Sequence, residues 1–148
     1  SFDNPMKIEL PANEPPIKKM DQKPQIWCLV RKKWVAFTKE EWVRQNWLNY
    51  LIHVQHYPAS LMAVEKEIHL GELKKRIDIL VYKNSSPWIL IECKEQEVPI
   101  SEQTIQQILT YQTVIQSGVL IVSNGNDTKA FQITGTQIQQ ISQLPKYQ

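Results

Sequence analysis

Two acidic residues and a lysine stand inside the most apolar part of the sequence. Residues 76–95 read RIDILVYKNSSPWILIECKE, and Asp78, Glu92 and Lys94 interrupt two runs rich in Ile, Leu, Val, Tyr and Trp. Residues of these apolar types favour strands that lie against a dry core, where an isolated charge is costly. The three ionisable groups therefore need a reason to be there.

The two runs predict an antiparallel hairpin that brings the acids together. Side chains alternate between the two faces of a strand, so the register should keep two wholly apolar sets on one face, namely Ile77, Ile79 and Val81 with Ile89, Ile91 and Cys93. A loop over residues 83–87 then gives four cross-strand pairs: Tyr82 with Trp88, Leu80 with Leu90, Asp78 with Glu92, and Arg76 with Lys94.

The pairing of Asp78 with Glu92 indicates a cation site. Like charges directly opposite one another repel, and Lys94 supplies only one compensating charge. Carboxylate oxygens suit Mg²⁺ or Mn²⁺, so a divalent cation held by the two acids would balance them. The alternative is a solvated, charged end of a sheet, held by Arg76 and Lys94 as surface ion pairs.

Length and composition exclude several classes of protein. The 148 residues suit one domain, and 42% hydrophobic with 22% charged residues are typical of a globular chain. Cys28 and Cys93 are too few for a disulfide framework, and neither belongs to a CxxC pair. The formal charge of +2 does not by itself indicate nucleic acid. No apolar run is long enough to span a bilayer and the amino terminus is polar, so we expect no membrane partner and a cytoplasmic location.

Patterns of polarity predict the elements around the hairpin. Five prolines indicate an extended amino-terminal arm over residues 1–25, and residues 26–37 predict two short strands around the basic turn Arg31–Lys33, which is either solvated or a phosphate contact. Thr38 should cap a helix that runs to about Gln55. Strands are predicted at residues 62–70, 73–82 and 88–94.

The carboxyl-terminal third predicts a second helix and further strands. Ser101 should cap a helix that carries apolar residues as far as Ile115 and stops at Gly118. Residues 119–122 are a continuous apolar run, typical of a strand covered on both faces, and residues 130–134 predict another strand. The closing GTQIQQISQLP predicts a short helix.

Taken together, these motifs resemble a known group of nucleases. Asp78 followed by Glu92, Cys93 and Lys94 resembles the D…(D/E)xK core of the PD-(D/E)XK superfamily. KKWVAFTKEEWVRQ (32–45), KKRIDILVY and ILIECK look like small proteins related to the amino-terminal nuclease domain of type I restriction enzyme R subunits. Gln107 and Tyr111 match the superfamily's Q-x-x-x-Y element. The resemblance covers about residues 26–125, and no phosphate-loop motif of a helicase motor occurs.

The resemblance implies a fold and a site. It implies an α/β fold with a restriction-endonuclease-like mixed β-sheet flanked by helices, in the core order α-β-β-β-α-β, forming a single nuclease-like domain over residues 26–148. It implies metal ligation of Mg²⁺ or Mn²⁺ by Asp78, Glu92, the backbone carbonyl of Cys93 and a helix acid, which is Glu41 or, second, Glu40. Lys94 would orient the attacking water and stabilise charge on the phosphate.

Other residues are candidates for supporting roles. Gln107 and Tyr111 lie four apart on a helix and would assist Lys94 or a phosphate, unless they belong to a solvated face. Nucleic acid would approach a basic set formed by Lys74, Lys75, Arg76 and Arg44, although a solvated charge run is the default interpretation. Glu65 and Glu67 are interpreted as structural. The five tryptophans are interpreted as core or groove-rim residues, and an exposed one would reopen a stacking role.

Three functions therefore compete. The leading hypothesis is a metal-dependent endonuclease of restriction or repair type that acts on DNA, as a homodimer or with separate motor or specificity subunits. The second is a catalytically silent nucleic-acid-binding module with the same fold. The third is an interaction or structural protein whose acidic pair is a solvated sheet edge.

Overall fold

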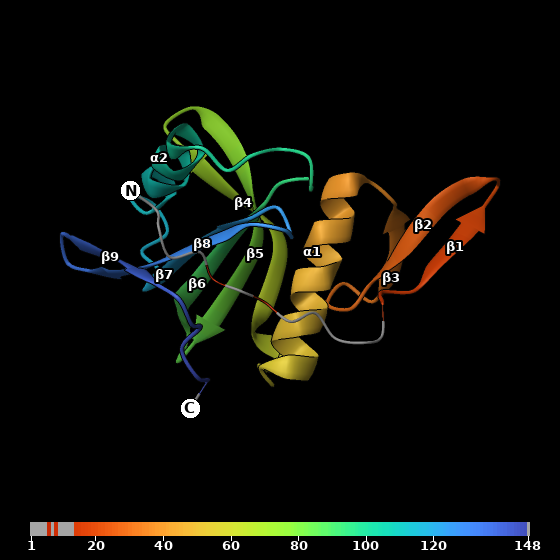
Figure 1. Cartoon of the computed structure of the whole chain (residues 1–148), viewed down its shortest axis with the longest axis horizontal. Helices are drawn as coiled ribbons and strands as arrows, with labels where there is room; N and C mark the ends of the chain where they lie inside the picture. The colour runs from red at the N-terminus through yellow and green to blue at the C-terminus, as the bar shows by residue number, and fades with distance from the viewer. Residues whose placement is uncertain (1–5, 7, 9–13, 148) are drawn as a thin grey trace.

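The structure is a computed structural model that describes Met6, Ile8 and residues 14–147 (Figure 1). The described residues form a mixed α/β fold with a three-stranded sheet, a six-stranded mixed sheet and two α-helices, as the sequence predicts at that level. In chain order the elements are β1 (Ile17–Met20), β2 (Lys23–Cys28), β3 (Lys33–Ala36), α1 (Lys39–Asn49), a π-helical turn (Tyr50–Val54), a 3-10 turn (Ala59–Leu61), β4 (Met62–Leu70), β5 (Leu73–Lys83), β6 (Ser86–Cys93), α2 (Glu102–Tyr111), β7 (Val119–Ser123), β8 (Thr128–Thr134) and β9 (Gln137–Ile141).

The larger sheet has the strand order β4-β5-β6-β7-β8-β9. β6 and β7 are parallel and every other neighbouring pair is antiparallel. Parallel neighbours require a crossover, and α2 lies in the connection between β6 and β7. All five residues of β7 are buried, as expected for a strand covered on both faces.

The central hairpin of β5 and β6 is tighter than predicted. Leu80 pairs with Leu90 as expected, but Tyr82 pairs with Pro87, so the predicted pair of Tyr82 with Trp88 is wrong. The reason is a two-residue turn over Asn84 and Ser85, whose φ angles of 52° and 63° suit a type I′ hairpin. A register shift between Val81 and Tyr82 absorbs the difference.

The two helices pack in two separate apolar clusters. α1 contributes Val43, Trp47 and Leu48 to a cluster with strand residues that include Ile79, Ile91 and Cys93. α2 contributes Ile105, Ile108 and Tyr111 to a second cluster with strand residues that include Leu80, Leu90 and Leu120. Because Ile79 and Leu80 are neighbours on one strand, their side chains point to opposite faces, so the clusters lie on either side of the sheet.

The alternation along β5 breaks beside Asp78. Ile77 packs in the α2 cluster, although the sequence predicts that it shares a face with Ile79. On the neighbouring strand, Glu65 has a φ of 56° between the paired residues Val64 and Lys66, which is a left-handed backbone inside a strand. Such irregularities re-aim side chains near functional sites, and here both Asp78 and Ile79 reach towards α1.

The two ends of the chain differ from prediction. Most of residues 1–13 lie outside the described residues, but β1 and β2 occupy part of the region where an extended arm was expected. Residues 137–141 form strand β9 instead of a short helix, because they pair with the edge of β8. α2 ends at Tyr111, before Gly118. None of the helices described is both long and apolar enough to cross a membrane.

Candidate functional site

The amino-terminal half of α1 presents charged side chains to the sheet. Thr38 is the N-cap, and its Oγ1 accepts a hydrogen bond of 2.9 Å from the backbone N–H of Glu41. The helix then buries Glu41, Arg44 and Gln45, with 7%, 5% and 0% of each residue exposed. Burying a charge is costly unless it is paired, so these side chains should have partners on the sheet.

Asp78 and Glu92 meet on adjacent strands, as the hairpin register predicts. Asp78 is 5% exposed and Glu92 is 7% exposed. The backbone N–H of Asp78 donates to Oε1 of Glu92 at 3.2 Å, and the backbone N–H of Cys93 donates to Oδ2 of Asp78 at 2.8 Å. The two carboxylates therefore lie side by side in a dry environment. The Cys93 side chain points into the core as expected.

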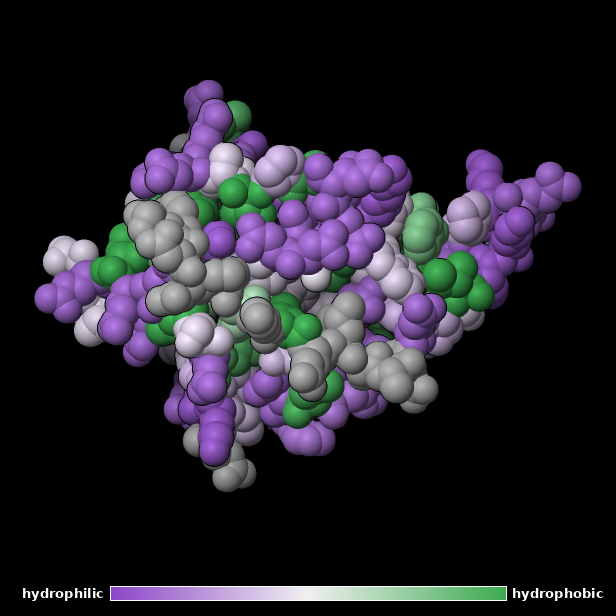
Figure 2. Space-filling model, viewed as in Figure 1, coloured by the Kyte–Doolittle hydropathy of each residue, from purple (hydrophilic) through white to green (hydrophobic). Residues whose placement is uncertain are grey.

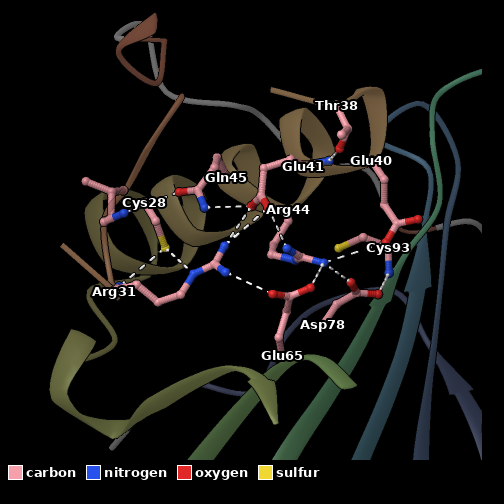
Figure 3. A network of polar contacts seen from close by, with 11 residues as sticks. Cys28, Arg31, Thr38, Glu40, Glu41, Arg44, Gln45, Glu65, Asp78 and Cys93 are labelled. Carbon is pink, nitrogen blue, oxygen red and sulfur yellow. Dashed lines mark hydrogen bonds and ion pairs between the residues drawn. The ribbon is translucent and has the colours of Figure 1, made fainter. Parts of the chain in front are cut away.

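Arg44 is the cation that reaches this pair from α1 (Figure 3). Its Nη2 lies 2.6 Å from Oδ1 of Asp78, and its Nη1 lies 2.6 Å from Oε1 of Glu41. Longer contacts of 3.5 Å and 3.6 Å join Nη2 to Glu65 and Glu40. Burial works against the charged form of Arg44, but the negative charges of Asp78, Glu41 and Glu65 raise its pKa above the usual value.

A second arginine completes the network on the other side of Glu41. Arg31 follows β2, and its guanidinium contacts both oxygens of Glu41 at 3.2 Å and Oε2 of Glu65 at 2.9 Å. Gln45 donates to Glu41 at 2.9 Å. The Nε of Arg31 donates to the Sγ of Cys28 at 3.2 Å. Although burial raises the pKa of that thiol, the hydrogen bonds from Arg31 more than offset this and lower it.

The environment of the acid pair shifts the pKa of two neighbouring groups. Burial, followed by the charge of Asp78, raises the pKa of Glu92 to about 8, although Lys94 acts in the opposite direction. The pKa of Tyr111 in α2 is also raised, by burial and then by the charges of Glu92 and Asp78. The charges of Lys94 and of the two acids thus influence one another's protonation, and the roles predicted for Lys94 and Tyr111 stay predictions.

The two glutamates of the α1 first turn face different partners. Glu41 is held by Arg31, Arg44 and Gln45. Glu40 lies on the Asp78 side of the Arg44 guanidinium (Figure 3). Its pKa is raised by burial and by the charge of Asp78, while Arg44 and Lys94 lower it. Of the two alternatives for the helix acid, the geometry favours Glu40 over Glu41.

Some candidate residues are not brought to this cluster by the described contacts. Gln107 is exposed, and its backbone carbonyl accepts a hydrogen bond from Thr110. Lys74 and Arg76 are exposed on β5, opposite His69 and Glu67 of β4. Arg44 was predicted to contact nucleic acid, but its guanidinium is turned inward because three buried or partly buried acids bind it.

Arg31 and Glu65 belong to the network although the sequence did not indicate this. Arg31 was interpreted as part of a basic turn and Glu65 as a structural strand residue. Their partners lie 10 and 34 positions away in the sequence, so no local pattern joins them. The one available signal was compositional: a lone arginine among lysines in the turn, because arginine is favoured for buried, forked ion pairs.

An open cleft of about 530 Å³ leads to the network. It is lined by side chains of the Arg31 turn, β3, α1, β4 and the loop after β6, among them Arg31, Val35, Ala36, Lys39, Glu40, Glu41, Arg44, Glu65 and Glu95. Acids outnumber bases in this lining, so the cleft should attract cations more than phosphates.

A hard divalent cation fits the donor chemistry of this site. Asp78, Glu92 and the carbonyl of Cys93 offer oxygen atoms only, and Glu92 is buried beside a like charge. Among the described residues, no three His, Cys, Asp or Glu side chains are arranged as a metal cage. Mg²⁺ commonly uses one or two carboxylates and completes its shell with water and substrate phosphate, so this arrangement still fits.

The fold and site together describe an α/β protein whose mixed sheet carries two buried acids, Asp78 and Glu92, on its central hairpin. Residues 39–145 match the family described as "Type I restriction enzyme R protein N terminus (HSDR_N)". Because this match spans more than half of the chain, the protein belongs to that family. The predicted relation to type I restriction R subunits is confirmed. No curated protein matches the chain.

Proposed function

We propose that this protein is a metal-dependent nuclease of restriction-endonuclease-like fold that hydrolyses phosphodiester bonds of DNA. The observation that carries the proposal is the meeting of the buried Asp78 and Glu92 carboxylates on adjacent strands, directly before Lys94. Membership in the restriction R family supports a restriction-related role with DNA and other subunits as partners. The superfamily proposed is PD-(D/E)XK.

Asp78, Glu92 and the carbonyl of Cys93 would hold the metal ion, with Glu40 at the rim of the site. When bound, such an ion lowers the pKa of a water molecule and polarises the phosphoryl oxygen. Lys94 would place its ammonium where negative charge develops on the phosphate and would orient the water. Arg44 holds Asp78 in position and supplies positive charge while the acids are otherwise unpaired. Tyr111, a buried residue of α2, would assist Lys94 or a phosphate.

The test compares two glutamate-to-glutamine variants of the full chain. Glu92→Gln keeps the size of the side chain and the acceptor for the Asp78 N–H but removes the carboxyl group that can ionise to bind a metal, whereas Glu102→Gln makes the same change at an exposed position of α2. We expect wild type and Glu102→Gln to bind Mn²⁺ in calorimetry and to cut plasmid or oligonucleotide DNA with Mg²⁺ or Mn²⁺. Glu92→Gln should lose both. Equal Mn²⁺ binding by all three proteins, without cleavage, would reject the proposal.

A specific observation favours a second candidate, a catalytically silent nucleic-acid-binding module. Asp78 already has a cation at 2.6 Å, because Arg44 occupies one of its oxygens. If Arg44 is a permanent substitute for the metal, DNA binding should persist in EDTA and should not change in Glu92→Gln or Lys94→Met. If the variants instead lose cleavage while their DNA binding in the absence of Mn²⁺ is unchanged, the acids act in catalysis.

A further inference from the structure

The three-stranded sheet of β1, β2 and β3 lies outside the part of the chain that the family match covers. The match begins at Lys39, and the sheet ends at Ala36. In Figure 1 the sheet projects from the far side of α1, away from the six-stranded sheet. The family match therefore assigns no role to this sheet, and its surface is considered separately.

The register of this sheet separates its residues into two faces. Ile17 pairs with Ile26 and Ile26 with Val35, while Trp27 pairs with Trp34. Because paired residues share a face and neighbours alternate, one face carries Ile17, Lys19, Pro24, Ile26, Cys28, Lys33 and Val35. The opposite face carries Lys18, Met20, Lys23, Gln25, Trp27, Trp34 and Ala36. We refer to the second set as the Trp–Lys face.

The Trp–Lys face points away from the body of the protein. Ile26 and Cys28 on the other face are 0% exposed, and Cys28 packs in the α1 cluster. Trp27 and Trp34 are partly exposed and belong to neither of the apolar clusters formed by the described residues. They pack edge to face with ring centroids 5.4 Å apart, and the Lys18 ammonium lies 4.2 Å from the Trp34 centroid.

Positive charge dominates the sheet. Residues 14–38 contain five lysines and Arg31 against Glu14 and Asp21. Arg31 is used by Glu41 and Glu65, but the lysines form no ion pair with any residue that the structure describes. Figure 2 shows hydrophilic surface along the projecting sheet. The Trp–Lys face thus joins two unpaired lysines to two aromatic rings and carries no acid.

We infer that the Trp–Lys face binds a single-stranded segment of nucleic acid. Unpaired bases stack on aromatic side chains, while lysines beside the rings neutralise the phosphates, and this combination does not require a particular sequence. The apolar side chain of Met20 extends the platform on which a base or sugar can rest. A duplex would offer phosphates but no free base faces, so the tryptophans favour a single strand.

Strand β3 connects the Trp–Lys face with the cleft. Val35 and Ala36 of β3 line the cleft beside the charged network, and acids outnumber bases in its lining. Ala36 also belongs to the Trp–Lys face. A polyanion is repelled by such a cleft, so a basic face on the sheet that borders the cleft would hold the strand near it. This inference rests on the proposed function for one point, the choice of nucleic acid as the ligand. Stacking of bases on the face requires neither the metal nor the acid pair.

Binding is measured by fluorescence anisotropy of a labelled oligo(dT) of roughly 15 nucleotides, with the full chain in EDTA at low salt. We expect Trp34→Ala to weaken binding by about 5- to 100-fold, and Trp34→Tyr to weaken it less because a ring remains. Lys18→Ala with Lys23→Ala should also weaken binding and reduce its salt dependence. Lys66→Ala with Lys146→Ala is the matched control, because both lysines are exposed on other parts of the surface.

The outcomes separate this inference from the proposed function. Circular dichroism shows whether Trp34→Ala folds, and the double-lysine variant gives an independent answer if it does not. If both variants bind oligo(dT) like the control, or if a blunt duplex binds as tightly and loses as much affinity, the single-strand assignment is wrong. Oligo(dT) binding that depends on Trp34 in a protein that never cleaves DNA supports this inference while rejecting the nuclease.

Discussion

The two α-helices of this protein pack against the large sheet in different ways. α2 has three buried residues, Ile105, Ile108 and Tyr111, which form an apolar stripe. α1 also packs apolar residues, but five of its eight buried residues are polar or charged, namely Glu41, Arg44, Gln45, Asn46 and Asn49. Both helices begin with a side-chain cap, from Thr38 and Ser101.

The difference shows which helix carries the charged network. Burying apolar area stabilises a fold without chemical consequence, whereas burying charges costs free energy that must be offset by partners. In α1 the partners are Asp78, Glu65 and Arg31, which come from three other segments. The main contribution of α1 is therefore to position Glu41 and Arg44 against these partners. Substitutions in the two helices should separate stability from function.

The largest effect is expected from Arg44→Met. The substitution leaves Asp78 buried beside Glu92 without its cation, and breaking a buried ion pair of this kind costs about 3–5 kcal/mol. Urea denaturation at neutral pH in EDTA measures the loss. Adding Asp78→Asn to Arg44→Met should recover part of the stability, because no unpaired charge then remains at that position. A double variant less stable than Arg44→Met would contradict this account.

Ile108→Ala in α2 should cost nearly as much stability but have a different functional result. Ile108 is 1% exposed in the α2 cluster, and such truncations typically cost 2–5 kcal/mol. Because the side chain has no part in the charged network, Mn²⁺ binding by the folded fraction should match that of wild type. Calorimetry with Mn²⁺, performed well below the unfolding temperature, checks this. A loss of metal binding would show that α2 also positions the site.

Glu92→Gln should change the pH dependence of stability. The pKa of Glu92 is raised to about 8 in the folded protein, from 4.5 when unperturbed, so the folded state retains a proton that the unfolded state releases between these values. This contribution to stability is present below pH 4.5 and is lost as the pH rises towards 8, with a slope of at most about 1.4 kcal/mol per pH unit.

Glutamine does not titrate, so the stability of Glu92→Gln relative to wild type should increase from pH 5 to pH 8 and then level off. Denaturant midpoints over this range, in EDTA, provide the measurement. A difference that stays constant with pH would mean that Glu92 is ionised throughout.

The smallest effects are expected from the two helix caps. Thr38→Ala and Ser101→Ala each remove an oxygen that accepts from a backbone N–H, at 2.9 Å and 3.2 Å, and each should cost about 1 kcal/mol. The two variants should differ in Mn²⁺ binding. Thr38→Ala loosens the turn that carries Glu40 and Glu41 and should weaken Mn²⁺ binding, whereas Ser101→Ala should leave it unchanged. Equal effects on metal binding would remove the functional distinction between the helices.

Much of the fold could be predicted because its signals are local. The period of two in residues 73–82 and 88–94 corresponds to β5 and β6, and the caps at Thr38 and Ser101 mark the starts of α1 and α2. The errors arose at two hairpins whose turns the sequence pattern did not reveal. β9 is a strand because β8 offers it an edge, and the hairpin register shifted because a two-residue turn replaced the longer predicted loop.

The sequence by itself determined that Asp78 and Glu92 would meet, because both lie in one hairpin whose apolar residues permit a single register near Leu80 and Leu90. Only the tertiary structure decided that Glu40 rather than Glu41 faces the pair, that Arg44 points inward, and that Trp27 and Trp34 share an outward face. These outcomes depend on charge pairs and packing between segments far apart in the chain. The free energy of an ion pair or a packing contact depends on the distance between the two groups in space. The spacing of residues within one helix or strand does not encode that distance.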